Sequence, residues 1–316
     1  MAGTAGDALA IGIDVGGTNI RAGLVDDDGS IHDREQVATP DDAEARMTAM
    51  LDLVARLSER ADVDRLPVGV GAAGLVDLDG VVRYSPNLDW RDAPVRAELA
   101  AALDVDVRVE NDAAAAAWGE YRAGAARDVD GGALMLTIGT GVGGGLIMDD
   151  RLIRGNAGIG GEFGHLIISE GGARCPCGNR GCLEALASGT AIGRRAAAAL
   201  ADGGDSALRD VDEVTGTAVT RAARDGDALA VEVLAEVGCW LGVGIASLVN
   251  SLDPGVVIIG GGVLSAGSLF LDPATEAYHA RVIAREHRDV APVLRAELGD
   301  DAGLIGAALL ALARHA

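Results

Sequence analysis

Residues 9–29 read LAIGIDVGGTNIRAGLVDDDG, in which two apolar, β-prone runs alternate with two turns. Gly16, Gly17 and Thr18 lie in the first turn, and an acidic turn follows the second run. Short apolar runs bounded by Gly, Asn and Asp clusters are typical of hairpins. We therefore predict that the chain opens with a β-hairpin.

A second, more degenerate copy of this pattern occupies residues 133–150. Its two apolar runs flank a turn of Gly139, Thr140 and Gly141, and Gly17 corresponds to Gly139. Repeated supersecondary units indicate repeated structural units. We predict an α/β chain of two related domains that face each other across a cleft, each a mixed sheet flanked by helices.

Glycine-rich turns expose backbone N–H groups that can bind phosphate oxygens. The simpler interpretation is that such a turn only needs a positive φ angle. Because the turn occurs twice and Asp14 precedes the first copy, we favour a nucleotide site in the cleft. Neither copy is a Walker A loop or a Gly-x-Gly-x-x-Gly helix start, which disfavours a dinucleotide fold.

A third glycine turn, Gly260-Gly261-Gly262, follows the apolar residues 256–259. Glycines at the end of a strand let a ligand approach the backbone at the carboxyl edge of a sheet. The alternative is a plain strand-to-helix turn. We predict that this turn also serves the nucleotide.

A cluster of metal-binding side chains lies near the middle of the chain, at His165, Cys175, Cys177 and Cys182. Thiolates and an imidazole suit a tetrahedral zinc, and four protein ligands leave no open position, which disfavours a catalytic zinc. A metal site in a reducing compartment fits this clustering better than a disulfide framework. The carboxylates Glu162 and Glu184 flank the cluster, so the predicted zinc would hold them for a polar ligand.

Asp112 follows a predicted strand at residues 105–109 and precedes an alanine run. One interpretation is a helix cap, because Asn or Asp before such a run begins a helix. The other is a general base, because transfer of a phosphoryl group to an alcohol needs a carboxylate to orient the hydroxyl and accept its proton. Its place beside the predicted phosphate cleft favours the base.

The chain has 316 residues, 49% of them hydrophobic, and a net charge of −22, and all 26 basic residues are arginine. This charge disfavours a nucleic-acid partner. We find no apolar run of membrane-spanning length and no signal peptide, so we expect a cytoplasmic protein that binds no membrane. The acidity fits either a solvated surface or, as we favour, adaptation to high salt, where screening relieves repulsion between carboxylates.

Together these motifs resemble the ROK family of sugar kinases and regulators, within the actin, hexokinase and heat-shock-70 ATPase superfamily. The combination Glu-x-Gly-His at residues 162–165 with Cys-x-Cys-Gly-x-x-Gly-Cys-x-Glu at residues 175–184 is highly specific, and the similarity spans nearly the whole chain. The resemblance implies two ribonuclease-H-like (actin-like ATPase) domains with a cleft between them. The first would cover residues 1–117 with 301–316, including a returning helix at residues 302–314, and the second residues 118–300.

The resemblance also implies a role for each motif. Asp112 would be the catalytic base. The sugar hydroxyls would be bound by the side chains of Asn87, Asn111, Asp112, Glu162, His165 and Glu184, although Asn87 could also be part of an ordinary loop. ATP phosphates and Mg²⁺ would be bound at Asp14, Gly16, Gly17, Thr18, Gly139, Thr140 and Gly141, and the adenosine at Gly260, Gly261 and Gly262. A structural Zn²⁺ would be held by His165, Cys175, Cys177 and Cys182.

The resemblance implies ATP-dependent phosphorylation of a hexose hydroxyl, and we expect glucose to glucose 6-phosphate. Fructokinase and N-acetylhexosamine or N-acetylmannosamine kinase activity remain alternatives, and a non-catalytic sugar sensor is a more distant one. A repressor is disfavoured, because only thirteen residues precede Asp14, fewer than a helix-turn-helix domain needs. Sugar and ATP are the expected partners, and we expect a homo-oligomer, either a dimer or a tetramer.

Overall fold

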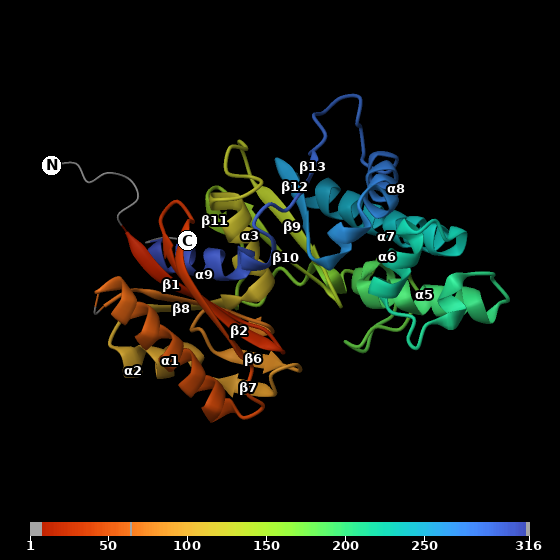
Figure 1. Ribbon diagram of the computed structural model, residues 1–316. Helices are drawn as coiled ribbons and strands as arrows, with labels where there is room; N and C mark the ends of the chain where they lie inside the picture. The colour runs from red at the N-terminus through yellow and green to blue at the C-terminus, as the bar shows by residue number, and fades with distance from the viewer. Residues whose placement is uncertain (1–7, 64, 314–316) are drawn as a thin grey trace. The chain divides into compact units, whose positions relative to one another are not determined.

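The computed structural model of the chain describes residues 8–63 and 65–313. These form two compact units (Figure 1). Unit 1 takes the described residues up to 134 together with 144–161 and 296–313, and unit 2 takes residues 135–143 and 162–295. The domain boundaries that the sequence predicts, near residues 117 and 300, stay a prediction.

The first sheet has the strand order β3-β2-β1-β4-β8. Its strands are β1 (Leu9–Val15), β2 (Asn19–Asp26), β3 (Ile31–Ala38), β4 (Val68–Ala72) and β8 (Val107–Asn111). The first three strands are antiparallel neighbours, whereas β1, β4 and β8 run parallel. The predicted hairpin is confirmed, and its turn is closed by the Gly16 N–H, which donates to the Asn19 carbonyl at 3.0 Å. A small antiparallel sheet follows, made of β5 (Leu75–Val76), β6 (Val82–Ser85) and β7 (Trp90–Ala93).

Helices cover both faces of the first sheet. On one face α1 (Ala43–Ala61) and α2 (Val95–Leu103) bury Met50, Leu53 and Leu99 against the isoleucines of β1. On the other face lie α3 (Asp112–Arg122) and α9 (Ala302–Leu312), and Figure 1 shows α1 and α9 on opposite sides. The helix predicted over residues 302–314 is thus confirmed as far as Leu312, and Arg314 lies outside the described residues.

Helix α9 lies unusually close to the strands beneath it. A Cβ atom at Gly12 would lie 1.9 Å from the Leu304 carbonyl oxygen, and one at Gly69 would lie 1.8 Å from that of Ala307. No side chain fits in that space, so these two neighbouring strand positions have to be glycine. The helix backbone therefore rests directly on β1 and β4.

The second sheet has the order β11-β10-β9-β12-β13, which repeats the order of the first. Its strands are β9 (Ala133–Ile138), β10 (Val142–Met148), β11 (Arg151–Leu152), β12 (Val256–Gly260) and β13 (Val293–Arg295). Both sheets place a hairpin first and then parallel strands, as β12 and β13 do here. The repeat inferred from the two glycine turns is therefore confirmed.

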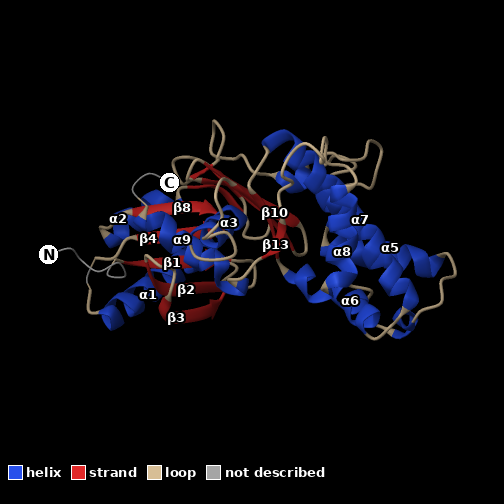
Figure 2. Cartoon of the chain, turned by 90° about the horizontal axis from the view of Figure 1, so that it is seen from above, coloured by secondary structure: helices blue, strands red, loops and turns tan. Residues whose placement is uncertain are grey.

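The helices of unit 2 gather into one group, as Figure 2 shows. They are α4 (Leu183–Ala187), α5 (Gly189–Ala201), α6 (Gly216–Arg224), α7 (Ala228–Leu252) and α8 (Ser268–His279). Short 3₁₀ helices occur at η1 (Phe163–His165), η2 (Ala207–Asp210), η3 (Gly262–Ala266) and, in unit 1, η4 (Gly299–Asp301). Helices α7 and α8 approach closely, since a Cβ at Gly242 would lie 2.2 Å from the Ala274 carbonyl oxygen.

The expectation that no apolar run reaches membrane-spanning length is wrong. Among the described residues, α7 has 25 residues and a most apolar window of mean hydropathy 1.8, enough by length and composition alone to cross a membrane. Half of that window is buried inside the structure, and α4, α5, α6 and α8 all contact this helix. We therefore interpret α7 as a core helix.

Aspartate provides most of the left-handed backbone positions outside glycine. The described non-glycine residues with positive φ are Ala284 and the aspartates Asp62, Asp89, Asp92, Asp104, Asp149, Asp150 and Asp253. Asp62, Asp104 and Asp253 end α1, α2 and α7 in this conformation. A short polar side chain tolerates this region better than others do. Part of the acidic surplus thus serves local turn geometry.

Candidate active site

In unit 1 the predicted site residues gather at the carboxyl edge of the three parallel strands. Asp14 on β1 is in register with Gly71 on β4, and Gly71 is in register with Glu110 on β8. Asn111 and Asp112 come next, where β8 ends and α3 begins. Ligands of open α/β sheets bind at this edge, and Asp14 and Asp112 both lie there.

Asn111, rather than Asp112, caps α3. Its Oδ1 accepts the Ala114 N–H at 3.0 Å, and its Nδ2 donates to the Gly74 carbonyl at 3.0 Å. Asp112 is the first residue of the helix, and its Oδ1 accepts the Ala113 N–H at 2.9 Å. Asn111 therefore fixes the turn from two sides, and the helix N-terminus holds the Asp112 carboxylate in a defined orientation.

Burial perturbs both carboxyl groups. It raises the pKa of Asp112, against the effect of the Ala113 N–H, which lowers it. Burial, together with the charge of Asp112, raises the pKa of Asp14 to about 6, and Arg21, whose Nη1 lies 4.0 Å from Asp14 Oδ2, lowers it only in part. Perturbed carboxyl groups at a sheet edge are typical of functional sites. A cation bound between them would favour the ionised form of both.

Asn87 lies against the first glycine turn. Its Cβ is 3.6 Å from the position that a Cβ of Gly17 would occupy. The same turn is held by Thr39, whose hydroxyl donates to the Gly16 carbonyl at 2.7 Å and whose N–H donates to the Thr18 carbonyl at 2.9 Å. The predicted sugar contact Asn87 and the predicted phosphate turn are thus neighbours in unit 1.

Two arginine interactions behind this edge were not anticipated. Arg46 of α1 is buried, donates to the carbonyls of Pro40, Asp41 and Leu88, and lies over the Trp90 ring, so it braces the loop that carries Asn87. An arginine in an amphipathic helix carries no sequence signal for such a role.

The second is an ion pair between Arg154 and Glu110. The other Glu110 oxygen accepts the Asn111 N–H at 2.9 Å. The sequence does show that Glu110 is a charged residue at the end of an apolar strand, which indicates that it needs a partner of opposite charge. The effect of this pair is to hold the backbone from which the catalytic candidate projects.

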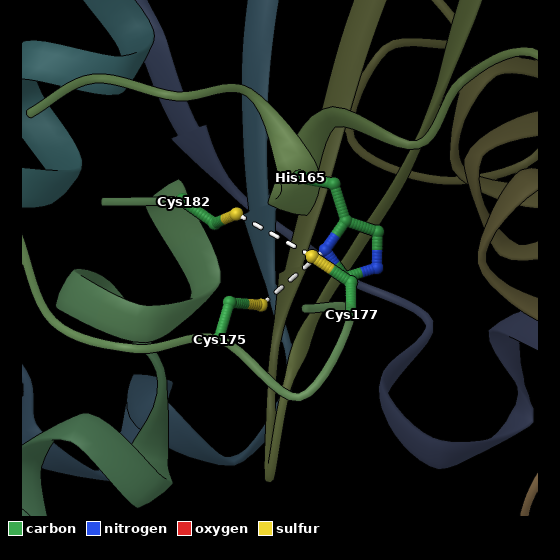
Figure 3. A group of neighbouring side chains, drawn as sticks. All are labelled: His165, Cys175, Cys177 and Cys182. Atoms are coloured by element: carbon green, nitrogen blue, oxygen red, sulfur yellow. Dashed lines mark hydrogen bonds between the residues drawn. The ribbon is translucent and has the colours of Figure 1, made fainter. Parts of the chain in front are cut away.

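In unit 2 the four predicted zinc ligands converge, as Figure 3 shows. One ligand atom from each of His165, Cys175, Cys177 and Cys182 lies within 4.8 Å of the others. The Cys177 and Cys182 sulfurs are 3.7 Å apart, as are Cys175 Sγ and His165 Nδ1. Tetrahedral zinc–sulfur bonds of about 2.3 Å require sulfurs separated by about 3.8 Å. The donor set and its spacing therefore fit a closed zinc site.

The neighbouring carboxylates are oriented by the same loop. His165 presents Nδ1 to the thiols, while its Nε2 lies 3.9 Å from Glu162 Oε2. Glu184 lies in the first turn of α4, two residues after Cys182, with its Oε1 3.8 Å from Cys175 Sγ. Burial raises the pKa of Cys175 to about 12, so a bound cation would be needed to hold its thiolate.

The two glycine turns of unit 2 lie next to each other. Gly261 has φ +86°, and a Cβ there would lie 2.5 Å from the carbonyl oxygen of Ile138, the residue before Gly139. The turn at Gly139 is tied to α5, because the Gly189 N–H donates to the Gly139 carbonyl at 2.8 Å. The predicted phosphate and adenosine turns thus share one edge of the second sheet.

The predicted site residues therefore form two groups, one in each unit. Unit 1 brings together Asp14, Gly16, Gly17, Thr18, Asn87, Asn111 and Asp112. Unit 2 brings together Gly139, Thr140, Gly141, Glu162, His165, Cys175, Cys177, Cys182, Glu184, Gly260, Gly261 and Gly262. Their roles as ligands of sugar, nucleotide and metal stay predictions.

Comparison with known proteins identifies the family. The model of the ROK family matches residues 10–314. The chain is 40% identical over 317 residues to a glucokinase of Streptomyces coelicolor, covering 96% of this chain and 97% of that protein. It is 38% identical over 311 residues to a glucokinase of Halalkalibacterium halodurans, covering 95% of this chain and 94% of that protein.

A solved structure agrees with these sequence relatives. A ROK family glucokinase from Streptomyces griseus, in complex with glucose and AMPPNP, matches with a TM-score of 0.80 and 44% identity over 96% of this chain and 99% of that one. The predicted fold class is thereby confirmed. The chain belongs to the ROK family.

Proposed function

We propose that this protein is an ATP-dependent glucokinase that converts glucose to glucose 6-phosphate. The observation that carries the proposal is Asp112, a carboxylate with a raised pKa, held at the carboxyl edge of a parallel sheet beside Asp14 and a glycine turn. The family match and the two glucokinases of similar sequence supply the substrate class. These features suit phosphoryl transfer, which enzymes catalyse mainly by positioning the reactants and stabilising the charge of the transferring group.

In the proposed reaction Asp112 accepts the proton of the sugar hydroxyl while the hydroxyl oxygen attacks the γ-phosphorus of ATP. The bond between that phosphorus and the β,γ-bridging oxygen breaks, and ADP leaves with the electron pair. A raised pKa brings the carboxylate closer to the working pH, which favours general-base catalysis. Its hydrogen bond with the Ala113 N–H fixes the orientation of the carboxylate toward the hydroxyl.

The sugar hydroxyls would be bound by hydrogen-bonding side chains, which distinguish sugars because these have little apolar surface. We assign this role to Asn87, Asn111, Glu162, His165 and Glu184. Zn²⁺ at His165, Cys175, Cys177 and Cys182 would be structural, fixing the imidazole and both glutamates. Asn111 has one amide hydrogen committed to Gly74, so its second one would face the sugar.

The nucleotide would be bound by backbone amides and Mg²⁺. We assign the phosphates to the turns at Gly16–Thr18 and Gly139–Gly141, the adenosine to Gly260–Gly262, and Mg²⁺ to the vicinity of Asp14 through water. The metal supplies positive charge to the transferring phosphoryl group. A chain of net charge −22 needs such a cation to attract ATP.

The remaining features are part of the same proposal. We place the enzyme in the cytoplasm, where thiols stay reduced for metal binding, and propose that it works as a homo-oligomer. We also propose that it is adapted to high salt. Screening of the acidic surface would then be needed for full stability.

The test is ADP formation with Mg²⁺, in dilute buffer and in molar KCl, with glucose, fructose, mannose, N-acetylglucosamine and N-acetylmannosamine. We expect turnover with a strong preference for glucose. We also expect a higher free energy of unfolding in molar KCl than in dilute buffer. Asp112→Asn should lower kcat by about 10²–10⁴-fold while glucose still binds. The matched control is Asp106→Asn, an exposed aspartate just before β8.

Three outcomes would contradict parts of this proposal. Retained turnover in Asp112→Asn would reject the base assignment. Sugar binding without any turnover in the unmodified chain would instead indicate a sensor. Full stability in dilute buffer would reject adaptation to salt.

A further inference from the structure

The turn at Gly139–Gly141 is held in place by residues of α4 and of the start of α5. The Thr190 hydroxyl donates to the Thr140 carbonyl at 2.7 Å, beside the bond from the Gly189 N–H to the Gly139 carbonyl. The third anchor is Glu184 of α4, whose Oε2 accepts the Val142 N–H at 3.0 Å. The three anchors bind Gly139, Thr140 and Val142, the residue that follows the turn.

Glu184 also fills the space beside the turn. A Cβ at Gly141 would lie 2.3 Å from Glu184 Oε2, so the carboxylate packs directly against the turn backbone. The side chain is only partly exposed, so it packs between the turn and the rest of unit 2. Displacement of this carboxylate would therefore disturb the turn itself.

Glu184 is fixed in turn by the metal loop. Its helix begins directly after Cys182, and its Oε1 contacts the Cys175 sulfur at 3.8 Å. The Leu183 N–H also donates to the Leu166 carbonyl at 2.8 Å, next to His165. The loop that carries the predicted sugar ligands and the turn predicted to bind phosphate are thus joined through one side chain.

We infer that Glu184 and Thr190 are positioning residues for the nucleotide turn, and that Glu184 joins the nucleotide site to the sugar-binding loop. This inference rests on the proposed function for the identity of both ligands. A turn already held in its binding conformation loses less conformational entropy when the phosphates bind, so the anchors should raise nucleotide affinity. Glu184 would then affect nucleotide binding even when no sugar is present.

The test measures binding of AMPPNP with Mg²⁺ by titration calorimetry in the absence of sugar, and glucose binding separately. Glu184→Ala should weaken AMPPNP binding about tenfold, because the Val142 N–H loses its acceptor. Glu184→Gln keeps an amide oxygen for that N–H and should bind AMPPNP within about twofold of the unmodified chain. Both variants should lose glucose affinity, so only the nucleotide measurement separates them.

Thr190 provides an independent second pair of variants. Thr190→Val removes the hydroxyl that reaches Thr140 and should weaken AMPPNP binding about threefold with glucose affinity unchanged, whereas Thr190→Ser should restore it. This pair decides the question if Glu184→Ala fails to fold. Thr190 is exposed, so its replacement disturbs no core packing.

The inference is overturned if Glu184→Ala binds AMPPNP as the unmodified chain does, or if the Gln variant is as weak as the Ala variant. It is also overturned if a correctly folded unmodified chain binds no AMPPNP. Failure of the proposed function would look different, because the unmodified chain would then phosphorylate no sugar while the nucleotide affinities could still differ as expected.

Discussion

Replacing Arg154 with methionine would remove the cation beside the buried Glu110 carboxylate. The Glu110 side chain is 5% exposed and that of Arg154 is 20% exposed, so water reaches the arginine more readily than the glutamate. Removing one partner of a buried ion pair costs about 3–5 kcal/mol, because the other charge stays buried. Since water can partly replace the arginine, we expect a loss of about 3 kcal/mol in the free energy of unfolding at pH 7.

The loss should depend on pH with a defined sign. Burial raises the pKa of Glu110 above its ordinary value of 4.5, and Arg154 counteracts this rise, so the variant would raise the pKa further. A carboxyl group whose folded pKa is raised favours the folded state most when it is protonated, and this contribution is lost as the pH rises. The variant should therefore approach the unmodified chain as the pH falls toward 4.5.

The assay is urea denaturation at pH 7 and pH 5, read as a shift of the midpoint at an unchanged slope. Glu110→Gln combined with Arg154→Met should recover most of the lost stability, because no charge is then left buried. Arg151→Met, at an exposed position three residues earlier, is the matched control. An unchanged midpoint in Arg154→Met, or a double variant as unstable as the single one, would refute this reasoning.

Two further predictions concern the two halves of the site. Asp14→Asn should raise the free energy of unfolding at pH 8 by about 2 kcal/mol. The pKa of Asp14 is raised from 3.8 to about 6, and each pKa unit corresponds to about 1.4 kcal/mol, which the partial exposure of the side chain reduces. That gain should vanish as the pH falls to about 4, which melting curves across pH would check; a pH-independent gain would contradict it. Cys177→Ala should lose zinc by metal analysis and weaken glucose binding, with the core intact because Cys177 is exposed. Unchanged glucose affinity after zinc loss would show that the metal does not hold Glu162 and Glu184.

The parts of the fold that depend on local pattern could be predicted from the sequence. The two hairpins, the strand at residues 256–259 and the convergence of the metal ligands all follow from spacing. In each case the decisive information lies within a short segment, as turn glycines or as cysteines close together in the chain. The sequence offered Asp112 as a cap of α3, whereas Asn111 caps it, because neighbouring Asn and Asp residues have similar capping ability.

The supporting contacts could not be predicted, because their partners are far apart in sequence. Arg46 meets Leu88, and Glu110 meets Arg154, through pairings that only the folded sheets bring about. The anchoring of the turn at Gly139 by Glu184 and Thr190 is of the same kind. The apolar length of α7 was missed in the sequence, although its aliphatic composition resembles that of a membrane helix.

The close contact of α9 with the first sheet has a consequence for biosynthesis. Strands β1 and β4 emerge early from the ribosome, but the helix that covers Gly12 and Gly69 emerges only after the whole of unit 2 has been made. Until then that face of the sheet has α3 but lacks α9, whereas residues 162–295 form a continuous segment that can pack as it appears. Strands β1 and β4 should thus reach their native packing after unit 2 does, and a ribosome stalled near residue 295 would present the part of the sheet that α9 covers to chaperones.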